Sequence, residues 1–353
     1  MENITHSYEI AEITYSIDKY FTEETLMFDI ECTGLSPRHA FVYLIGCAAR
    51  MGNSVTITQF FAQNEYDEES VLRAFEEYVS GFTGLMGFNS TRFDASFLLE
   101  RYRKYGIEAG FAKKPHIDMY LTVTKAKCLL DLPNYKQKTI EQYLGLNRED
   151  KYDGGQLIPI YKEYSKNNDM EARDLVLLHN LEDVKGMVYC CDIMAYSLIA
   201  DVEFDNFSQE PISDKARFTL KLPFTLANAI NKQRSYGLYI IKGDCATVTL
   251  NVTNSTLMTF LPDYKNYYYL IDEQIIIPKV LGQSISSDRK RNAKKQDCFA
   301  KADGYFIELP EKLAVPTNIR VFKTAYEDPR QFIPATDLTS GLACQILRFM
   351  LKH

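Results

Sequence analysis

The chain has 353 residues, 46% of them hydrophobic, and includes 24 Tyr and 21 Phe. Such a composition is typical of a globular protein with a substantial core, and the length suffices for two domains because single cores stop growing near roughly 250–300 residues. The eight cysteines form no C-x-x-C pair, which excludes a zinc ribbon and a small disulfide scaffold. We expect a cytoplasmic protein, since the sequence has neither a signal-peptide pattern nor an apolar run of about 18 residues that could span a membrane.

The net charge of −7 is unevenly distributed along the chain. Residues 201–353 contain 20 Lys+Arg and 17 Asp+Glu, a balance of +3. Subtracting these from the totals of 40 and 47 leaves 20 and 30 for residues 1–200, a balance of −10. Acidic side chains are therefore concentrated in the first half, and basic side chains are relatively enriched in the second.

The first half alternates strand and helix signals. Strand-like segments at 25–31, 40–49 and 54–62 are joined by two short links, which predicts an antiparallel meander. Helices and strands then alternate along the chain. The predicted segments are 67–82 (helix), 84–89 (strand), 93–106 (helix), 115–120 (strand) and 169–199 (a long final helix). Three meander strands followed by β-α-β-α units predict a mixed α/β sheet with helices on its faces.

The sequence pattern changes from alternating helices and strands to mainly strands beyond about residue 205. Segments 238–253, 263–278 and 304–310 are strand-rich, and their turns carry Gly, Pro, Asn and Asp. We predict two domains, 1–200 and 201–353, the second mainly β within an α+β class. The polar stretch 201–216 has no periodicity and is interpreted as a linker.

Two carboxylates stand out in "MFDIECTGL" (27–35). Asp29 and Glu31 are i and i+2 on a predicted strand, so their side chains leave the same face, roughly 6.5–7 Å apart along the strand. Unpaired carboxylates are costly in a core. Two-metal sites hold their ions about 3.5–4 Å apart, and such a carboxylate pair suits them. A salt-bridged or edge-exposed pair is the alternative interpretation.

Two further segments carry candidate residues. Asp94 follows a strand that ends near Asn89 and begins a helix, where the N-terminus tolerates negative charge. His179 and Asp183 are i and i+4 on one face of the long helix. Each residue also has an alternative interpretation. Asp94 could simply be an acid at the start of a helix, and Asn89 a turn residue. His179 could be a hydrogen-bonded core histidine, and Asp183 a solvated aspartate.

In this order and on these elements, D-x-E, N-x-x-x-F-D and H-x-x-x-D resemble the DEDD, or DnaQ-like, 3′–5′ exonuclease superfamily, and especially its bacterial ribonuclease H-like exonuclease domains. "FDIECTGL" differs from the family's common F-D-I-E-T-T-G-L only at Cys32. The resemblance covers about residues 25–195. It implies a ribonuclease H-like, five-stranded mixed sheet, with Asp29, Glu31, Asp94 and Asp183 as metal ligands.

The histidine departs from the family pattern. The histidine subclass places its His five residues before the last Asp, and the tyrosine subclass places its Tyr four before. His179 stands four residues before Asp183, so it occupies the tyrosine spacing.

The resemblance also implies a two-metal mechanism, with Asp29 bridging both ions. One ion lowers the pKa of the attacking water and the other stabilises the leaving oxygen. Two Mg²⁺ or Mn²⁺ are expected rather than zinc because the ligands are oxygens. His179, with an unperturbed pKa near 6.5, suits a general base. Cation binding by four carboxylates accounts for the acidic first half without excluding a polyanionic substrate.

Candidates for substrate contact also occur outside the acidic motifs. Asn89 is one, and a basic segment in the second half is another: Arg289, Lys290, Arg291, Lys294 and Lys295. A solvated basic helix face explains the segment equally well. Tyr267, Tyr268 and Tyr269 could stack on bases, but their place on a strand favours packing in a core.

We therefore expect a divalent-metal-dependent 3′–5′ exonuclease acting on single-stranded DNA or RNA with a free 3′ end. A structure-selective endonuclease is one alternative. A catalytically weak nucleic-acid-binding module is another, although such a module has no use for four converging carboxylates.

Overall fold

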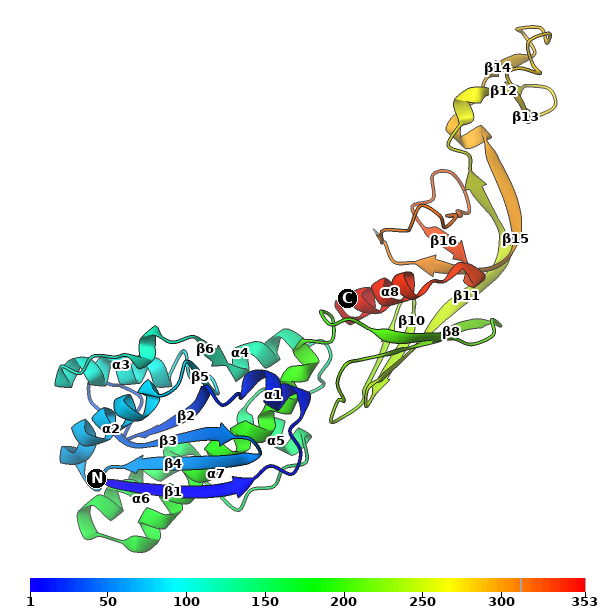
Figure 1. Cartoon of the computed structure of the whole chain (residues 1–353). Helices are drawn as coiled ribbons and strands as arrows, with labels where there is room; N and C mark the ends of the chain where they lie inside the picture. The colour runs from blue at the N-terminus through cyan, green and yellow to red at the C-terminus, as the bar shows by residue number, and fades with distance from the viewer. Residues whose placement is uncertain (312, 353) are drawn as a thin grey trace. The chain divides into compact units, whose positions relative to one another are not determined.

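The computed structural model describes residues 1–311 and 313–352, which divide into two compact units (Figure 1). The first unit comprises Met1–Ile199 together with Phe224–Asn228. The second comprises Ala200–Pro223 and the described residues from Ala229 onward. Within the described ranges, no helix combines the length and the apolar character that a membrane crossing requires.

A six-stranded mixed sheet forms the framework of the first unit, in the order β1-β4-β3-β2-β5-β6. The strands are β1 (Glu2–Glu9), β2 (Thr25–Cys32), β3 (Val42–Met51), β4 (Ser54–Phe61), β5 (Gly84–Gly87) and β6 (His116–Asp118). The predicted meander is confirmed, because β2, β3 and β4 pair antiparallel. β5 pairs parallel with β2, and β6 pairs parallel with β5.

The sheet has one strand more than the five that the sequence led us to expect. β1 pairs antiparallel with β4 at the edge of the sheet, with Glu2 opposite Phe61 and Glu9 opposite Ser54. Most of its side chains are polar and exposed. An edge strand of this kind buries little apolar surface, so its sequence gives only a weak strand signal.

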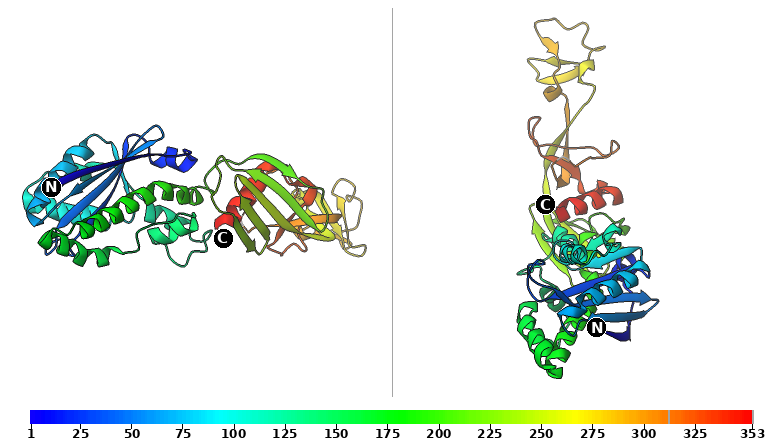
Figure 2. Two further views of the ribbon diagram at one scale, coloured as in Figure 1. Left: turned by 90° about the horizontal axis from the view of Figure 1, so that it is seen from below. Right: turned by 90° about the vertical axis from the view of Figure 1, so that its left-hand side faces the viewer.

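Helices cover both faces of this sheet (Figures 1 and 2). They are α1 (Tyr15–Tyr20), α2 (Glu68–Ser80), α3 (Asp94–Tyr105), α4 (Met119–Val123), α5 (Gln137–Tyr143), α6 (Gly154–Asn167) and α7 (Met170–Met194). Short 3-10 helices lie at Glu65–Asp67, Phe111–Lys113, Thr124–Ala126 and Ala195–Ser197. The predicted helices at 67–82, 93–106 and 169–199 are confirmed as α2, α3 and α7.

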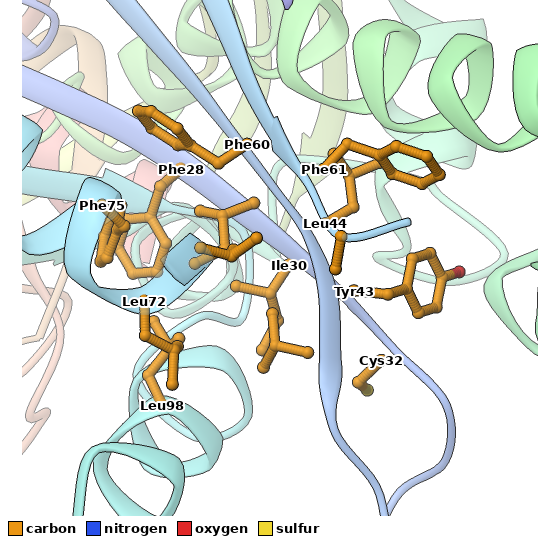
Figure 3. Packing of buried hydrophobic residues seen from close by; sticks show 14 of the residues in the cluster. Phe28, Ile30, Cys32, Tyr43, Leu44, Phe60, Phe61, Leu72, Phe75 and Leu98 are labelled. Atoms are coloured by element: carbon orange, nitrogen blue, oxygen red, sulfur yellow. The ribbon is translucent and has the colours of Figure 1, made fainter. Parts of the chain in front are cut away.

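Alternation along β2 separates apolar from acidic side chains. Phe28 packs against Phe75 of α2, with ring centroids 5.5 Å apart, and Ile30 belongs to the same core cluster as Leu72 and Leu98 (Figure 3). Asp29 and Glu31 therefore point to the opposite face of the sheet. That face is covered by α7, whose Asn180 contacts Asp29.

The second unit is mainly β, as the sequence predicts. One sheet has the order β16-β15-β11-β10-β9, with β8 paired to β11 and β7 to β8; a three-stranded sheet has the order β13-β12-β14. The strands are β7 (Asp205–Gln209), β8 (Lys215–Lys221), β9 (Ile230–Arg234), β10 (Gly237–Lys242), β11 (Cys245–Phe260), β12 (Tyr267–Leu270), β13 (Ile275–Pro278), β14 (Lys290–Asn292), β15 (Phe299–Leu309) and β16 (Gln331–Pro334). The helical segments are 3-10 turns at Tyr264–Asn266, Lys295–Asp297 and Ala335–Asp337, and the helix α8 (Ser340–Lys352).

The linker predicted at 201–216 is wrong. β7 lies within it and pairs antiparallel with β8, with Gln209 opposite Phe218, and the first residues of β8 pair with β11. β7 is largely exposed and polar, with the sequence DNFSQ, so its alternation does not mark it as a strand. Backbone pairing to β8, rather than apolar patterning, makes it part of the sheet.

Candidate active site

One cavity of about 450 Å³ in the first unit brings the acidic motifs together. Its lining includes all five residues predicted to carry chemistry, which come from β2 (Asp29, Glu31), the first turn of α3 (Asp94) and the middle of α7 (His179, Asp183). Asn89 lines the same cavity. The structure thus collects side chains that are up to 154 residues apart in the sequence, from Asp29 to Asp183.

Three of these side chains are close enough to hold a common ion. One ligand atom each of Glu31, His179 and Asp183 lies within 4.8 Å of the others. The Nε2 atom of His179 is 3.1 Å from Asp183 Oδ2 and 3.4 Å from Glu31 Oε1. Glu31 and His179 are buried, whereas Asp183 is partly exposed to the cavity.

Asp29 and Asp94 are held by hydrogen bonds from the framework of the domain. Asn180 donates from Nδ2 to Asp29 Oδ2 over 3.1 Å, and Gln59 donates to Asn180 Oδ1 over 3.0 Å. The backbone N–H of Ile30 donates to Asp94 Oδ1 over 3.1 Å. These bonds fix the direction in which each carboxylate points.

The acids of β2 and α3 strongly resist ionisation in this environment. Burial, reinforced by the charges of Asp94 and Asp183, raises the pKa of Asp29 well above its ordinary value. Burial and the charges of Asp183 and Asp94 raise the pKa of Glu31 likewise. Burial raises the pKa of Asp94 to about 7. Clustered carboxylates that repel one another in a low-dielectric site are stabilised by bound cations.

Asp183 behaves differently because it has cationic partners. Burial acts to raise its pKa, but the hydrogen bond and charge of His179 and the charge of Arg148 outweigh burial and lower it. For His179, burial acts to lower the pKa, but hydrogen bonds and charges from Asp183 and Asp150 outweigh it and raise the pKa. The two groups of this α7 pair thus favour their ionised forms, in a site whose other acids favour the protonated form.

Sequence reasoning missed two charged residues of the site. Arg148 forms an ion pair with Asp183 Oδ1 and a second one with Glu141. Asp150 lies 2.8 Å from His179 Nδ1 through its Oδ2 atom. Both residues follow α5 in a loop whose sequence, "NREDKYD", reads as an ordinary polar connection. No local pattern indicates that this loop folds back onto α7.

Asn89 has a backbone role that does not depend on any substrate. It adopts a left-handed conformation, with φ of 58°, and its N–H donates to Asp118 Oδ1 over 3.1 Å. Asn tolerates this conformation better than most residues. The turn interpretation is thus confirmed, and contact with a substrate stays a prediction because Asn89 also lines the cavity.

The basic segment lies in the second unit and is partly neutralised. Arg289 pairs with Asp272 and Glu273, and Arg291 pairs with Asp297. Its alternative interpretation as a helix face is wrong, because residues 290–292 form β14 and the following turn is a 3-10 helix. Phosphate contact by this segment stays a prediction.

The three consecutive tyrosines do not lie in a core, which corrects the sequence-based interpretation. Tyr267, Tyr268 and Tyr269 form β12 and are all half-buried. Lys290 Nζ lies 4.8 Å from the ring centroid of Tyr268, and the Arg291 guanidinium lies 4.1 Å from that of Tyr269. A three-stranded sheet is too small to bury both faces of its central strand, and cations cover the rings of Tyr268 and Tyr269.

One family model matches a part of the first unit. Residues 26–194 match the sequence model of the RNase_H superfamily. No curated protein matches the sequence.

Several solved structures are similar to the chain at low identity. The family B DNA polymerase of the archaeon Pyrobaculum calidifontis is 13% identical, with a TM-score of 0.40, over 93% of this chain and 41% of the polymerase. Escherichia coli exonuclease I bound to single-stranded DNA and zinc is 16% identical, with a TM-score of 0.29, over 44% of this chain and 43% of the exonuclease. The same enzyme with a dA16 oligonucleotide is 15% identical, with a TM-score of 0.29, over 60% and 55%. The chain thus spans about half the length of these proteins or less.

Proposed function

We propose that residues 26–194, a ribonuclease H superfamily domain, act as a divalent-metal-dependent 3′–5′ exonuclease on single-stranded DNA or RNA. The observation that carries this proposal is the convergence of Asp29, Glu31, Asp94 and Asp183 in one cavity. A nuclease must neutralise an anionic phosphodiester and generate a nucleophile, and carboxylates that bind hard cations serve both needs.

The donor set fits divalent cations. Four carboxylates line the cavity, and three of them have raised pKa values because they are buried close to one another. A positive ion removes this repulsion, and oxygen donors suit Mg²⁺ and Mn²⁺. Two such ions, when bound, would supply Lewis acidity for activating water and for stabilising the leaving oxygen.

The protein's own residues prepare the site. Asn180 and the backbone of Ile30 orient the carboxylates of Asp29 and Asp94. Arg148 neutralises one oxygen of Asp183 and leaves the other facing Glu31 and His179. A rigid arrangement of this kind lowers the cost of positioning a substrate phosphate. The role of His179 as a general base stays a prediction from the sequence.

An Asp94→Asn variant tests the proposal most directly. It removes one negative charge while keeping an acceptor for the Ile30 N–H. We expect degradation of a 5′-labelled single-stranded oligonucleotide in Mn²⁺ to fall by at least about a hundredfold, in keeping with the loss of one preorganised electrostatic group. Circular dichroism checks that the variant is folded.

The control is Asp174→Asn, which changes an exposed acid on α7 outside the cavity. It should degrade the oligonucleotide at the wild-type rate. Stepwise shortening from the 3′ end of the wild-type substrate supports the exonuclease, whereas discrete internal cuts indicate the endonuclease. If Asp94→Asn degraded the oligonucleotide as fast as the wild type, the assignment of this site as catalytic would be wrong.

A further inference from the structure

His179 is fixed on both sides of its imidazole ring. Nδ1 lies 2.8 Å from Asp150 Oδ2, while Nε2 faces Asp183 and Glu31 at 3.1 and 3.4 Å. The side chain is 3% exposed. Since a carboxylate only accepts, Nδ1–H is the donor to Asp150. Nε2 is consequently the ring atom directed at the acids of the cavity.

Asp150 is itself held firmly. The N–H of Tyr152 donates to its Oδ1 over 3.0 Å, and Lys138 Nζ donates to its Oδ2 over 3.1 Å. Its own backbone N–H donates to Glu182 Oε2 over 2.8 Å. A carboxylate that accepts from the far nitrogen of a histidine is a common partner of metal-binding imidazoles, because it fixes the tautomer and the ring orientation.

The separations around Nε2 are those of neighbouring ligands on one ion. Two atoms that are each about 2.1 Å from a metal lie roughly 3.0–3.4 Å apart at octahedral or tetrahedral angles. The distances from Nε2 to the two carboxylate oxygens fall at 3.1 and 3.4 Å. His179 and Asp183 are also i and i+4 on α7, a spacing that places two ligands on one helix face.

We infer that His179 is a metal ligand through Nε2, and that with Glu31 and Asp183 it forms a mixed nitrogen–oxygen site that binds Mn²⁺ in preference to Mg²⁺. Asp150 is the positioning residue of this ligand. The inference rests on the proposed function, and it replaces the general-base role, because a nitrogen that binds a metal has no lone pair left to accept a proton. An imidazole ligand favours Mn²⁺ over Mg²⁺, which prefers oxygen donors and retained water.

The test is manganese binding to the full-length, tag-free protein, followed by electron paramagnetic resonance. Titration of free Mn²⁺ gives the stoichiometry and Kd, and pulsed measurement of ¹⁴N modulation reports a nitrogen bound directly to the ion. We expect ¹⁴N modulation in the wild type and its replacement by ¹⁵N signals in protein labelled with ¹⁵N-histidine. His179→Gln should abolish the modulation, and His6→Gln, an exposed histidine outside the cavity, should retain it.

Asp150→Asn separates positioning from ligation. The variant should keep ¹⁴N modulation but bind Mn²⁺ about 10–100-fold more weakly, as expected for loss of a partner behind the ligand. In His179→Gln, the Kd for Mg²⁺ divided by the Kd for Mn²⁺ should decrease, because the nitrogen ligand that favours Mn²⁺ over Mg²⁺ is gone.

The outcomes distinguish this inference from the proposed function. Bound Mn²⁺ without ¹⁴N modulation in the wild type overturns histidine ligation while leaving an all-carboxylate nuclease intact. Mn²⁺ binding that is unaffected by Asp29→Asn, together with an absence of nuclease activity, overturns both. The labelled wild type answers the question without any substitution, so a His179 variant that fails to fold does not prevent the test.

Discussion

At the scale of single residues, Gly46 shows how a missing side chain makes room for the acid site. Gly46 is opposite Asp29 in the β2–β3 pair. A Cβ atom there would lie 2.1 Å from Asn180 Oδ1 and 2.8 Å from Val184 Cγ2. Since Asn180 holds Asp29, the close approach of α7 to the sheet at this point also sets the orientation of a candidate metal ligand.

Gly46→Ala should therefore destabilise the first unit. The added methyl group must displace α7 or force Asn180 into another rotamer, a cost of about 1–3 kcal/mol for an overpacked core. Urea unfolding measures the change. Gly81→Ala is the matched control, because its new Cβ meets only ordinary contact at 3.6 Å from Tyr78 O, and it should stay within about 0.5 kcal/mol of the wild type. Equal stability of the two variants would show that α7 is not closely packed at Gly46.

The residues of the site differ in how far the sequence could identify them. Asp29, Glu31, Asp94, His179 and Asp183 sit in short motifs with fixed spacings on identifiable elements, and the structure gathers them in one cavity. Arg148 and Asp150 could not be found in this way, because their contacts with Asp183 and His179 depend on the path of a polar loop. Local periodicity carries no information about such tertiary pairing.

At the scale of elements, the same contrast separates predicted from missed structure. β2, α2 and α7 have apolar patterns set by burial, and the sequence predicts them. β1 and β7 are polar strands that are held by backbone pairing to a neighbour, so their side chains carry little signal. The pattern of apolar residues indicates which face of an element is buried, and an exposed edge strand has scarcely any buried face.

The contact between α1 and α7 makes a pH-dependent contribution to stability. Thr14 is the N-cap of α1, where it accepts from the Ile17 N–H, and its hydroxyl donates to Asp192 of α7. Burial raises the pKa of Asp192 above its ordinary value of 3.8, although the Thr14 hydrogen bond acts against burial. The native state thus binds the Asp192 proton more tightly than the unfolded chain does.

The sign of the effect follows from linkage. The stabilisation from this group is fully present below pH 3.8 and is lost as the pH rises through the raised pKa of the native state. Asp192→Asn is neutral throughout and can still accept from Thr14. Its stability relative to the wild type should therefore increase as the pH rises above 3.8, as measured by urea unfolding in EDTA. Asp174→Asn, an exposed acid on α7, is the control; a parallel increase in that variant would assign the effect to general charge repulsion.

At the scale of the whole molecule, the uneven charge along the chain corresponds to the division into two units. Residues 1–200 carry the balance of −10 and contain the acidic cavity, whereas residues 201–353 carry +3. Each unit has a hydrophobic core cluster of its own. Two units with separate cores are expected to unfold in separable steps, and a cation bound to the acids stabilises only the unit that holds them.

Metal removal should accordingly shift one unfolding transition and leave the other in place. At a Mn²⁺ concentration about one hundred times Kd, binding stabilises the first unit by ~2.7 kcal/mol, which corresponds to a rise in Tm of about 5–10 °C for a unit of this size. Calorimetry of the full chain in Mn²⁺ and in EDTA measures the shift, and Gly46→Ala identifies the transition of the first unit by lowering it. In Asp29→Asn the response to Mn²⁺ should largely vanish, because one of the four carboxylates is gone. If Mn²⁺ raised both transitions equally, or raised that of Asp29→Asn as much as that of the wild type, the ion would be acting elsewhere than at the acidic cavity.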